Sequence, residues 1–159
     1  MFSLTTPLAL LIISAVLHGV HAESHTITFT NDCGFGTPTL VENGNILSTG
    51  GAYTSDGPIV SAVAYLQTGA CGLNGENCTV VETTLANPTT SGSGSATDIS
   101  FVTPHEFSSV VGFAYYNGCD GEGSGCDGPT CSGAFTNSTN GTVVTCEADN
   151  VDLAITFCD

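Results

Sequence analysis

Eight cysteines are the residues whose number and spacing most clearly imply chemistry in this chain. They are Cys33, Cys71, Cys78, Cys119, Cys126, Cys131, Cys146 and Cys158. The spacings contain no pair of C-x2-C motifs, and His25 and His105 are the only histidines after residue 22. This pattern favours disulfides over zinc, because zinc sites usually combine closely spaced ligand pairs. We therefore expect four disulfides, no metal ion and no cofactor.

Two other segments contain residues that bind metals or transfer protons in many proteins, but their patterns are incomplete. Residues 120–125 resemble the first half of a calcium loop, with oxygen ligands at alternate positions and glycine at the sixth. The position of the bidentate glutamate is Cys131, so we interpret this segment as a flexible disulfide loop. His105 belongs to no zinc-protease or nucleophile-elbow motif, and we interpret it as a loop histidine.

The first residues have the character of an export signal. Residues 8–17 form an apolar run that is too short to span a bilayer comfortably, and small residues at Val20 and Ala22 fit a signal-peptidase site. We predict a signal peptide over residues 1–22 and one domain over residues 23–159. The protein is then secreted, extracellular or associated with a cell wall, with no membrane attachment after the signal is removed.

The charge composition restricts the possible partners. The chain has fifteen acidic residues and no lysine or arginine, for a formal net charge of −15. Nucleic acids and anionic lipids would be repelled, so neutral polysaccharides or cationic proteins fit better. Crowded carboxyl groups are also expected to have raised pKa values, which makes stability fall as the pH rises. We expect a monomer.

The hydrophobic pattern predicts an all-β domain. Apolar and polar residues alternate over residues 26–30 and 151–157, at the two ends of the domain. Runs rich in β-branched and aromatic residues predict further strands over 59–67, 79–85, 98–102 and 107–116. Residues 87–97 and 117–133 are predicted loops. We expect an antiparallel β-sandwich in which both terminal strands pair in one sheet.

Five segments resemble, in order, those of the thaumatin-like proteins. They are residues 29–33, residues 68–72 followed by Cys78, residues 98–102, the C-x4-C segment at 125–131 and residues 155–159. The resemblance implies a small thaumatin-like sandwich that lacks most of the family's disulfide-rich second domain. It also implies the pairs Cys33–Cys158 and Cys71–Cys78. Three pairings stay open for the other four cysteines, with Cys146 favoured to bond into the glycine-rich loop.

The resemblance also implies a functional cleft. In that family, β-1,3-glucan binding, weak glucanase activity and antifungal action are attributed to a cleft with one arginine and four acids. Glu82 and Asp98 take two of the acidic positions, whereas the others fall at Thr103 and at Ser138 or Asn140, and the arginine falls at Val63.

We expect a non-catalytic glycoprotein that binds a neutral cell-wall polysaccharide such as β-1,3-glucan through Glu82 and Asp98. One alternative is a weak endo-β-1,3-glucanase with these carboxyls as catalytic pair, at a separation of about 5–9.5 Å. The other is a structural or host-interaction protein without a small ligand. Sequons at Asn77, Asn137 and Asn140 predict N-glycosylation, with Asn77 disfavoured by its neighbour Cys78. The four tyrosines, Tyr53, Tyr65, Tyr115 and Tyr116, are candidates for sugar stacking, although core packing is expected for Tyr65 and Tyr115.

Overall fold

Residues 22–159 are described by a computed structural model in which they form twelve strands and no helix. All but the last residue of the expected signal peptide lie outside the described residues. The strands are β1 (His25–Asn31), β2 (Thr37–Glu42), β3 (Asn45–Ser48), β4 (Tyr53–Ser55), β5 (Ile59–Gln67), β6 (Val80–Leu85), β7 (Ser95–Ser100), β8 (Val111–Tyr116), β9 (Gly123–Cys126), β10 (Ala134–Phe135), β11 (Val144–Cys146) and β12 (Asp152–Phe157).

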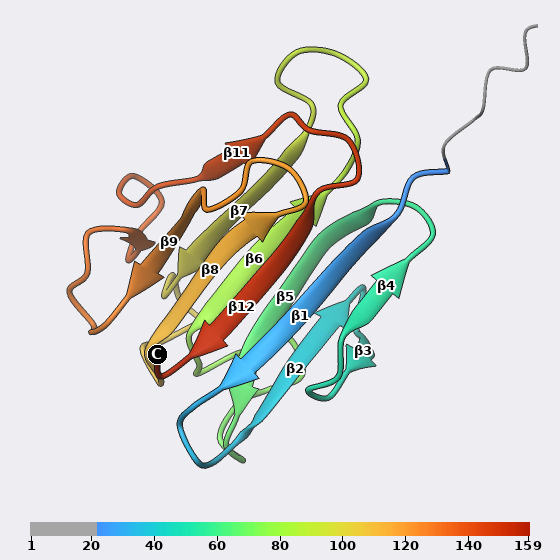
Figure 1. The fold of residues 1–159 in the computed structure, drawn as a ribbon. Coiled ribbons are helices and arrows are strands. Elements are labelled where there is room, and N and C mark those ends of the chain that lie inside the picture. The colour runs from blue at the N-terminus through green and yellow to red at the C-terminus, as the bar shows by residue number, and fades with distance from the viewer. Residues whose placement is uncertain (1–21) are drawn as a thin grey trace, which may run out of the picture.

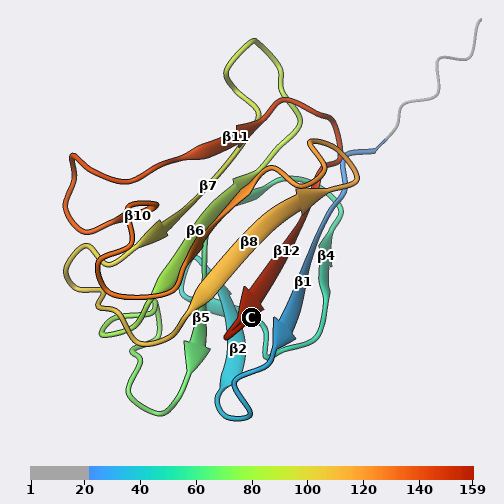
Figure 2. The same ribbon diagram turned by 60° about the vertical axis from the view of Figure 1, so that its left-hand side comes forward.

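The strands form two sheets that stack as layers (Figures 1 and 2). The five-stranded sheet has the order β4-β1-β12-β8-β9. The seven-stranded sheet has the order β10-β7-β6-β5-β2-β3, with β11 also paired to β7. As the sequence predicts, the first and last strands lie in one sheet, where β1 (blue) is the direct neighbour of β12 (red).

Two strand pairs run parallel, so the expectation of a purely antiparallel sandwich is wrong for them. These pairs are β1 with β12 and β7 with β10. Apolar alternation in a strand indicates which face is buried, but it carries no information about the direction of the neighbouring strand.

The strand boundaries follow the sequence pattern closely in some places and depart from it in others. Strand β5 has the predicted bounds, but β7 begins inside the predicted loop over 87–97 and β8 begins only at Val111. Strand β9 lies within the predicted loop over 117–133. A Cβ at Gly123 would collide with the Phe113 carbonyl on β8, so β9 needs the glycine that the sequence pattern reads as a turn signal.

The hydrophobic core lies between the sheets and is supplied by alternate residues of both. From β12, the side chains of Leu153, Ile155 and Phe157 are fully buried. They pack with buried side chains of the facing layer, among them Leu40, Ala62, Ala64, Leu66, Val81, Leu85 and Ile99. A smaller apolar cluster lies on the other face of the seven-stranded sheet, where it comprises Val41, Tyr65, Cys78 and Val80.

A buried polar network links the layers at Tyr115. The Tyr115 hydroxyl, on β8, lies 2.9 Å from Thr97 Oγ1 and 3.0 Å from the Val144 carbonyl oxygen. Thr97 Oγ1 is itself 2.7 Å from Thr83 Oγ1. Burial raises the pKa of Tyr115 to about 12, so the phenol remains neutral. The sheets are therefore joined by hydrogen bonds that involve no charge.

A buried histidine fixes the first strand by its side-chain contacts. His25 is fully buried, with Nε2 3.1 Å from Glu23 Oε1 and Nδ1 2.6 Å from the Val151 carbonyl oxygen. Both ring nitrogens therefore lie within hydrogen-bonding distance of an oxygen. Glu23 also accepts the Asn87 N–H at 2.7 Å. The contact thus connects β1, the residue directly before β12 and the loop after β6.

Two disulfides are the pairs implied by the resemblance. Cys33–Cys158 joins the ends of β1 and β12, with a Cα–Cα distance of 5.0 Å. Cys71–Cys78 closes the loop between β5 and β6. The first bridge therefore ties the two ends of the domain together, and the second encloses a short loop on the outer face of the seven-stranded sheet.

The remaining disulfides resolve the pairings that the sequence left open. Cys119 pairs with Cys146, and Cys126 pairs with Cys131. Cys146 thus bonds into the glycine-rich loop through Cys119. This bridge connects the turn after β8, in one sheet, to β11, in the other.

We expect Tyr115→Phe to lower the free energy of unfolding by about 1–2 kcal/mol, because it removes a hydroxyl that hydrogen-bonds both the Val144 carbonyl oxygen and the Thr97 hydroxyl. Equilibrium denaturation with the disulfides intact measures the change. Tyr53→Phe is the matched control, since no hydrogen bond of the Tyr53 hydroxyl is present among the described residues. Equal stability of Tyr115→Phe and the wild type would contradict a stabilising role for the network.

The disulfides are expected to differ in their effect on stability according to the length of chain they close. Cys33–Cys158 spans 125 residues and Cys126–Cys131 spans 5. In the chain-entropy account, removing them costs about 5 and about 2 kcal/mol. Denaturation midpoints of the two double Cys→Ser variants test the ranking, and equal losses would rule out loop closure as the main source of stabilisation.

Candidate functional site

Two acidic residues that face each other across neighbouring strands form the centre of the candidate site. Glu82 on β6 and Asp98 on β7 are register partners in the antiparallel pair. Directly opposed residues have Cβ atoms about 4.5–5.5 Å apart, so the two carboxyl groups lie side by side. Because Val81 and Thr83 are buried in the core, the alternation of β6 directs Glu82 to the outer face.

The setting of the pair changes the acidity of one member. Burial, together with the charge of Glu82, raises the pKa of Asp98 from 3.8 to about 6. The sequence prediction of raised carboxyl pKa values is met here, but it is wrong for Glu23 and Glu76. Their pKa values are lowered, Glu23 chiefly by the Asn87 N–H and Glu76 by its own N–H and that of Asn74.

A pocket of about 390 Å³ opens beside the pair. Its lining comprises Glu82, Asp98, Ser100, Val102, Thr103, Pro104, His105, Phe135 and Ser138. The short strand β10 brings Phe135 to this place, because Phe135 is the register partner of Ser100 and its carbonyl accepts the Phe101 N–H at 2.7 Å. The segment that follows β7, Val102–His105, supplies four more of the lining residues.

A second pocket, of about 320 Å³, adjoins the first. It shares Glu82 and Asp98 and extends toward β5, where Val63 is the register partner of Glu82. Its other lining residues are Ser61, Ala62, Thr83, Thr84 and Ala96. The acidic pair therefore lies at the junction of two hollows on the outer face of the seven-stranded sheet.

The structure brings together most of the positions that the resemblance implies for a cleft. Thr103 and Ser138 line the first pocket with the acidic pair, and Val63 lines the second. Asn140, the alternative to Ser138, lines neither. The hydroxyl groups of Thr103 and Ser138 thus occupy the two positions at which the resemblance implies carboxyl groups. The isopropyl group of Val63 occupies the position of the implied arginine.

Two of the lining residues that were not identified from the sequence carry a ring. His105, interpreted as a loop histidine, lines the first pocket and bonds through Nδ1 to the Gly75 carbonyl oxygen at 2.9 Å. Phe135 is a partly exposed aromatic ring in a strand of two residues. Such a short strand has no detectable periodicity, so no signal in the sequence indicated that this ring would reach the acids.

The tyrosines take other places. Tyr65 and Tyr115 are buried, as the preference for core packing predicts. Neither Tyr53 nor Tyr116 lines one of the two pockets that contain the acidic pair. Of the phenylalanine and tyrosine rings, Phe135 is therefore the one that lines the pocket with Glu82 and Asp98.

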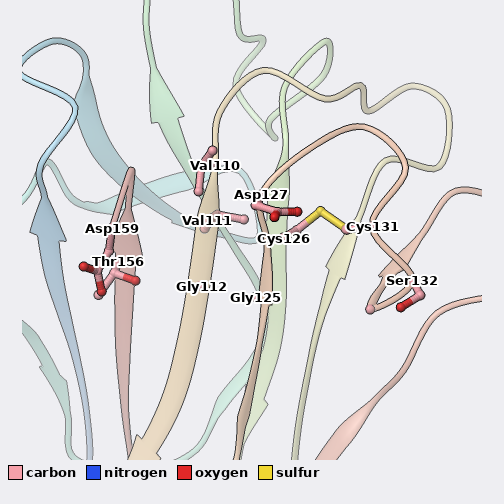
Figure 3. Close-up of a pocket in the computed structure, with 11 residues that line it drawn as sticks. Val110, Val111, Gly112, Gly125, Cys126, Asp127, Cys131, Ser132, Thr156 and Asp159 are labelled. Carbon is pink, nitrogen blue, oxygen red and sulfur yellow. A yellow bond between two sulfur atoms is a disulfide. The ribbon is translucent and has the colours of Figure 1, made fainter.

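A third hollow, of about 570 Å³, lies in the other sheet beside the Cys126–Cys131 disulfide (Figure 3). Asp127 and Ser132 lie on one side of it, and Thr156 and Asp159 near the end of β12 lie on the other. Its remaining lining is chiefly glycine backbone and valine. It contains no aromatic side chain and no closely paired carboxyls in register, so it offers less recognition chemistry than the pocket beside Glu82.

Metal binding has no support within residues 22–159, where no group of three or more His, Cys, Asp or Glu side chains is placed to hold an ion. The segment that resembles half a calcium loop instead turns into β9 at Gly123. The described part of the chain also has no helix that could cross a membrane.

Comparison with known proteins leaves the fold and the pocket as the basis for any assignment. No protein-family model matches the chain, and no curated protein matches it either. The described residues define an all-β domain of two sheets with four disulfides, which is consistent with an extracellular protein. The thaumatin-like resemblance stays a prediction.

The raised pKa of Asp98 predicts a specific pH dependence. Above the unfolded value of 3.8 the unfolded chain releases this proton first, so the contribution of Asp98 to stability falls as the pH rises to about 6 and then stays low. Asp98→Asn should therefore match the wild type at pH 3.5 but be more stable at pH 7.5. The expected gain is roughly 1–2 kcal/mol after allowance for partial exposure.

Denaturation of both proteins at the two pH values measures this difference in stability. Glu23 and Glu76 oppose the effect of Asp98, but both proteins contain them, so their contributions cancel when the two stabilities are subtracted. Glu122→Gln is the control for net charge, because Glu122 is exposed in the turn before β9. A stability gain of equal size in both variants would assign the effect to overall charge instead of to the pair.

Proposed function

We propose that this chain is a secreted, thaumatin-like glycoprotein that binds a neutral cell-wall polysaccharide such as β-1,3-glucan without cleaving it. The observation that carries the proposal is the pocket in which Glu82 and Asp98 lie close to an aromatic ring, Phe135, and to several hydroxyl groups. Such a combination suits a sugar, which presents hydroxyl groups at its edge and C–H groups on its faces.

Each part of the pocket has a role in this binding mode. The carboxyl oxygens of Glu82 and Asp98 accept hydrogen bonds from sugar hydroxyls, and these charge-assisted bonds are stronger than neutral ones. Thr103 and Ser138 donate and accept. The Phe135 ring packs against the apolar face of a pyranose. The net charge of −15 disfavours an anionic polysaccharide.

A weak endo-β-1,3-glucanase is the second candidate, favoured by the pKa of about 6 at Asp98 beside Glu82. A raised pKa next to another carboxyl group is the arrangement of an acid and base pair. Glycosidases, however, place their carboxyls on either side of the scissile bond. Opposed residues on one face of a sheet lie on the same side of a bound sugar, so we favour binding over hydrolysis.

Binding is tested by sedimentation of the secreted protein with insoluble β-1,3-glucan. We expect the wild type to sediment with the glucan and Phe135→Ala to bind about tenfold more weakly, a loss of about 1.4 kcal/mol. Glu82→Gln should also bind more weakly, because it removes the charge from one acceptor. Glu122→Gln should bind like the wild type.

A reducing-sugar assay on soluble β-1,3-glucan separates the alternatives. Binding without sugar release supports the proposal. Release that disappears in Glu82→Gln and Asp98→Asn supports the glucanase. Neither binding nor release, in a protein whose four disulfides are verified by mass, contradicts both and favours a structural or host-interaction role without a small ligand.

A further inference from the structure

The three sequons have different settings in the folded chain, and Asn77 has the least favourable one. The hydroxyl residue of its sequon, Thr79, is fully buried, with Oγ1 accepting the Ser108 N–H at 2.8 Å and donating to the Ser109 carbonyl at 3.2 Å. The Asn77 N–H itself donates to the Pro104 carbonyl at 2.8 Å. This sequon is therefore part of the packing around the Cys71–Cys78 loop.

Both the oxygen and the nitrogen of the Asn140 side-chain amide form hydrogen bonds within their own turn. Its Oδ1 accepts the N–H groups of Thr136 and Asn137 at 3.1 and 3.0 Å. Its Nδ2 donates to Thr136 Oγ1 at 2.7 Å. The next residue, Gly141, packs so closely on the Phe135 ring that a Cβ there would meet the ring atoms. A substituent on Asn140 Nδ2 would crowd the bond to Thr136.

Asn137 differs because only the oxygen of its side-chain amide forms hydrogen bonds. Its Oδ1 accepts the Thr139 N–H at 2.9 Å, the Thr139 hydroxyl at 2.8 Å and the Asn140 N–H at 3.2 Å. The amide is planar, so Nδ2 is directed away from these contacts. Nδ2 has no hydrogen-bond partner among the described residues, and Asn137, Ser138 and Thr139 are all exposed.

We propose that Asn137 is the residue of this turn that carries an N-linked oligosaccharide, and that this oligosaccharide stands at the mouth of the pocket beside Glu82 and Asp98. The first part follows from the free Nδ2 and the exposed sequon. The second part follows from Ser138, the next residue, which lines the pocket. The consequence for ligand access rests on the proposed function, but the position of the oligosaccharide does not.

The modification is a transfer of a glycosyl group to nitrogen. Asn137 Nδ2 forms a bond to the anomeric carbon of an oligosaccharide that is linked to a lipid pyrophosphate. The bond between that carbon and the pyrophosphate oxygen breaks, the lipid pyrophosphate leaves, and Nδ2 loses one proton. The donor is supplied by the secretory membrane of a eukaryotic host.

The site is tested by expressing the full chain in a eukaryotic secretory host and measuring intact mass before and after enzymatic removal of N-glycans. We expect one oligosaccharide, which is lost in Asn137→Gln and in Thr139→Ala. Asn140→Gln is the matched control and should keep it. A chain without glycan, or a glycan that persists in Asn137→Gln and disappears in Asn140→Gln, would overturn the assignment.

The position at the pocket is tested without any ligand. Carbodiimide coupling of the carboxyl groups to a bulky amine, mapped by peptide mass, should modify Glu82 and Asp98 several-fold faster in Asn137→Gln and Thr139→Ala than in the glycosylated protein. Glu122 should react equally in all three. Equal rates at Glu82 and Asp98 would contradict the position. Glucan sedimentation of the same samples separately decides the proposed function, because absent binding in every form leaves the mass and coupling results standing.

Discussion

The structure has to be built without lysine or arginine, and this constraint determines how its carboxyl groups are held. Within residues 22–159, six acidic side chains accept hydrogen bonds from backbone N–H groups; they are Glu23, Glu42, Glu76, Asp120, Glu147 and Asp152. Each contact fixes a turn or the start of a strand, for example Asp152 on the Thr26 N–H at 2.6 Å. Carboxyl groups therefore act as local clamps on the backbone. Asp98 is different, because burial and a neighbouring acid raise its pKa, and it lies in a pocket.

Hydrogen bonds and a disulfide loop also hold the residues of the candidate site in place. The antiparallel pair of β6 and β7 fixes Glu82 opposite Asp98, and the buried network at Tyr115 holds β7 against the other sheet. The wall formed by Val102–His105 rests on the Cys71–Cys78 loop, since His105 Nδ1 bonds to the Gly75 carbonyl and the Glu106 N–H bonds to the Cys78 carbonyl. A small disulfide loop that contacts no ligand is thus a support for the pocket.

Much of the fold could be predicted from the sequence because it depends on local patterns. The alternation in β12 and the β-branched run of β5 identify buried strands, and an even set of cysteines identifies a disulfide frame. The acids of the site were predicted only through resemblance, since fifteen acids in one chain make any pair unremarkable by composition. Phe135 could not be predicted, because it reaches the pocket through a two-residue strand. Strand β9 was missed because it is rich in glycine, which has the composition of a turn, although Gly123 is needed there for close approach to β8.

By itself, the sequence determined the disulfide chemistry and the all-β class, because these depend on residue types and on spacing along the chain. Only the tertiary structure decided that β1 and β12 run parallel, that Cys146 pairs with Cys119, and which residues surround Glu82 and Asp98. These features join segments that are distant in sequence. Their geometry follows from how two twisted layers pack, and no local pattern of side chains encodes the register or direction of a remote partner.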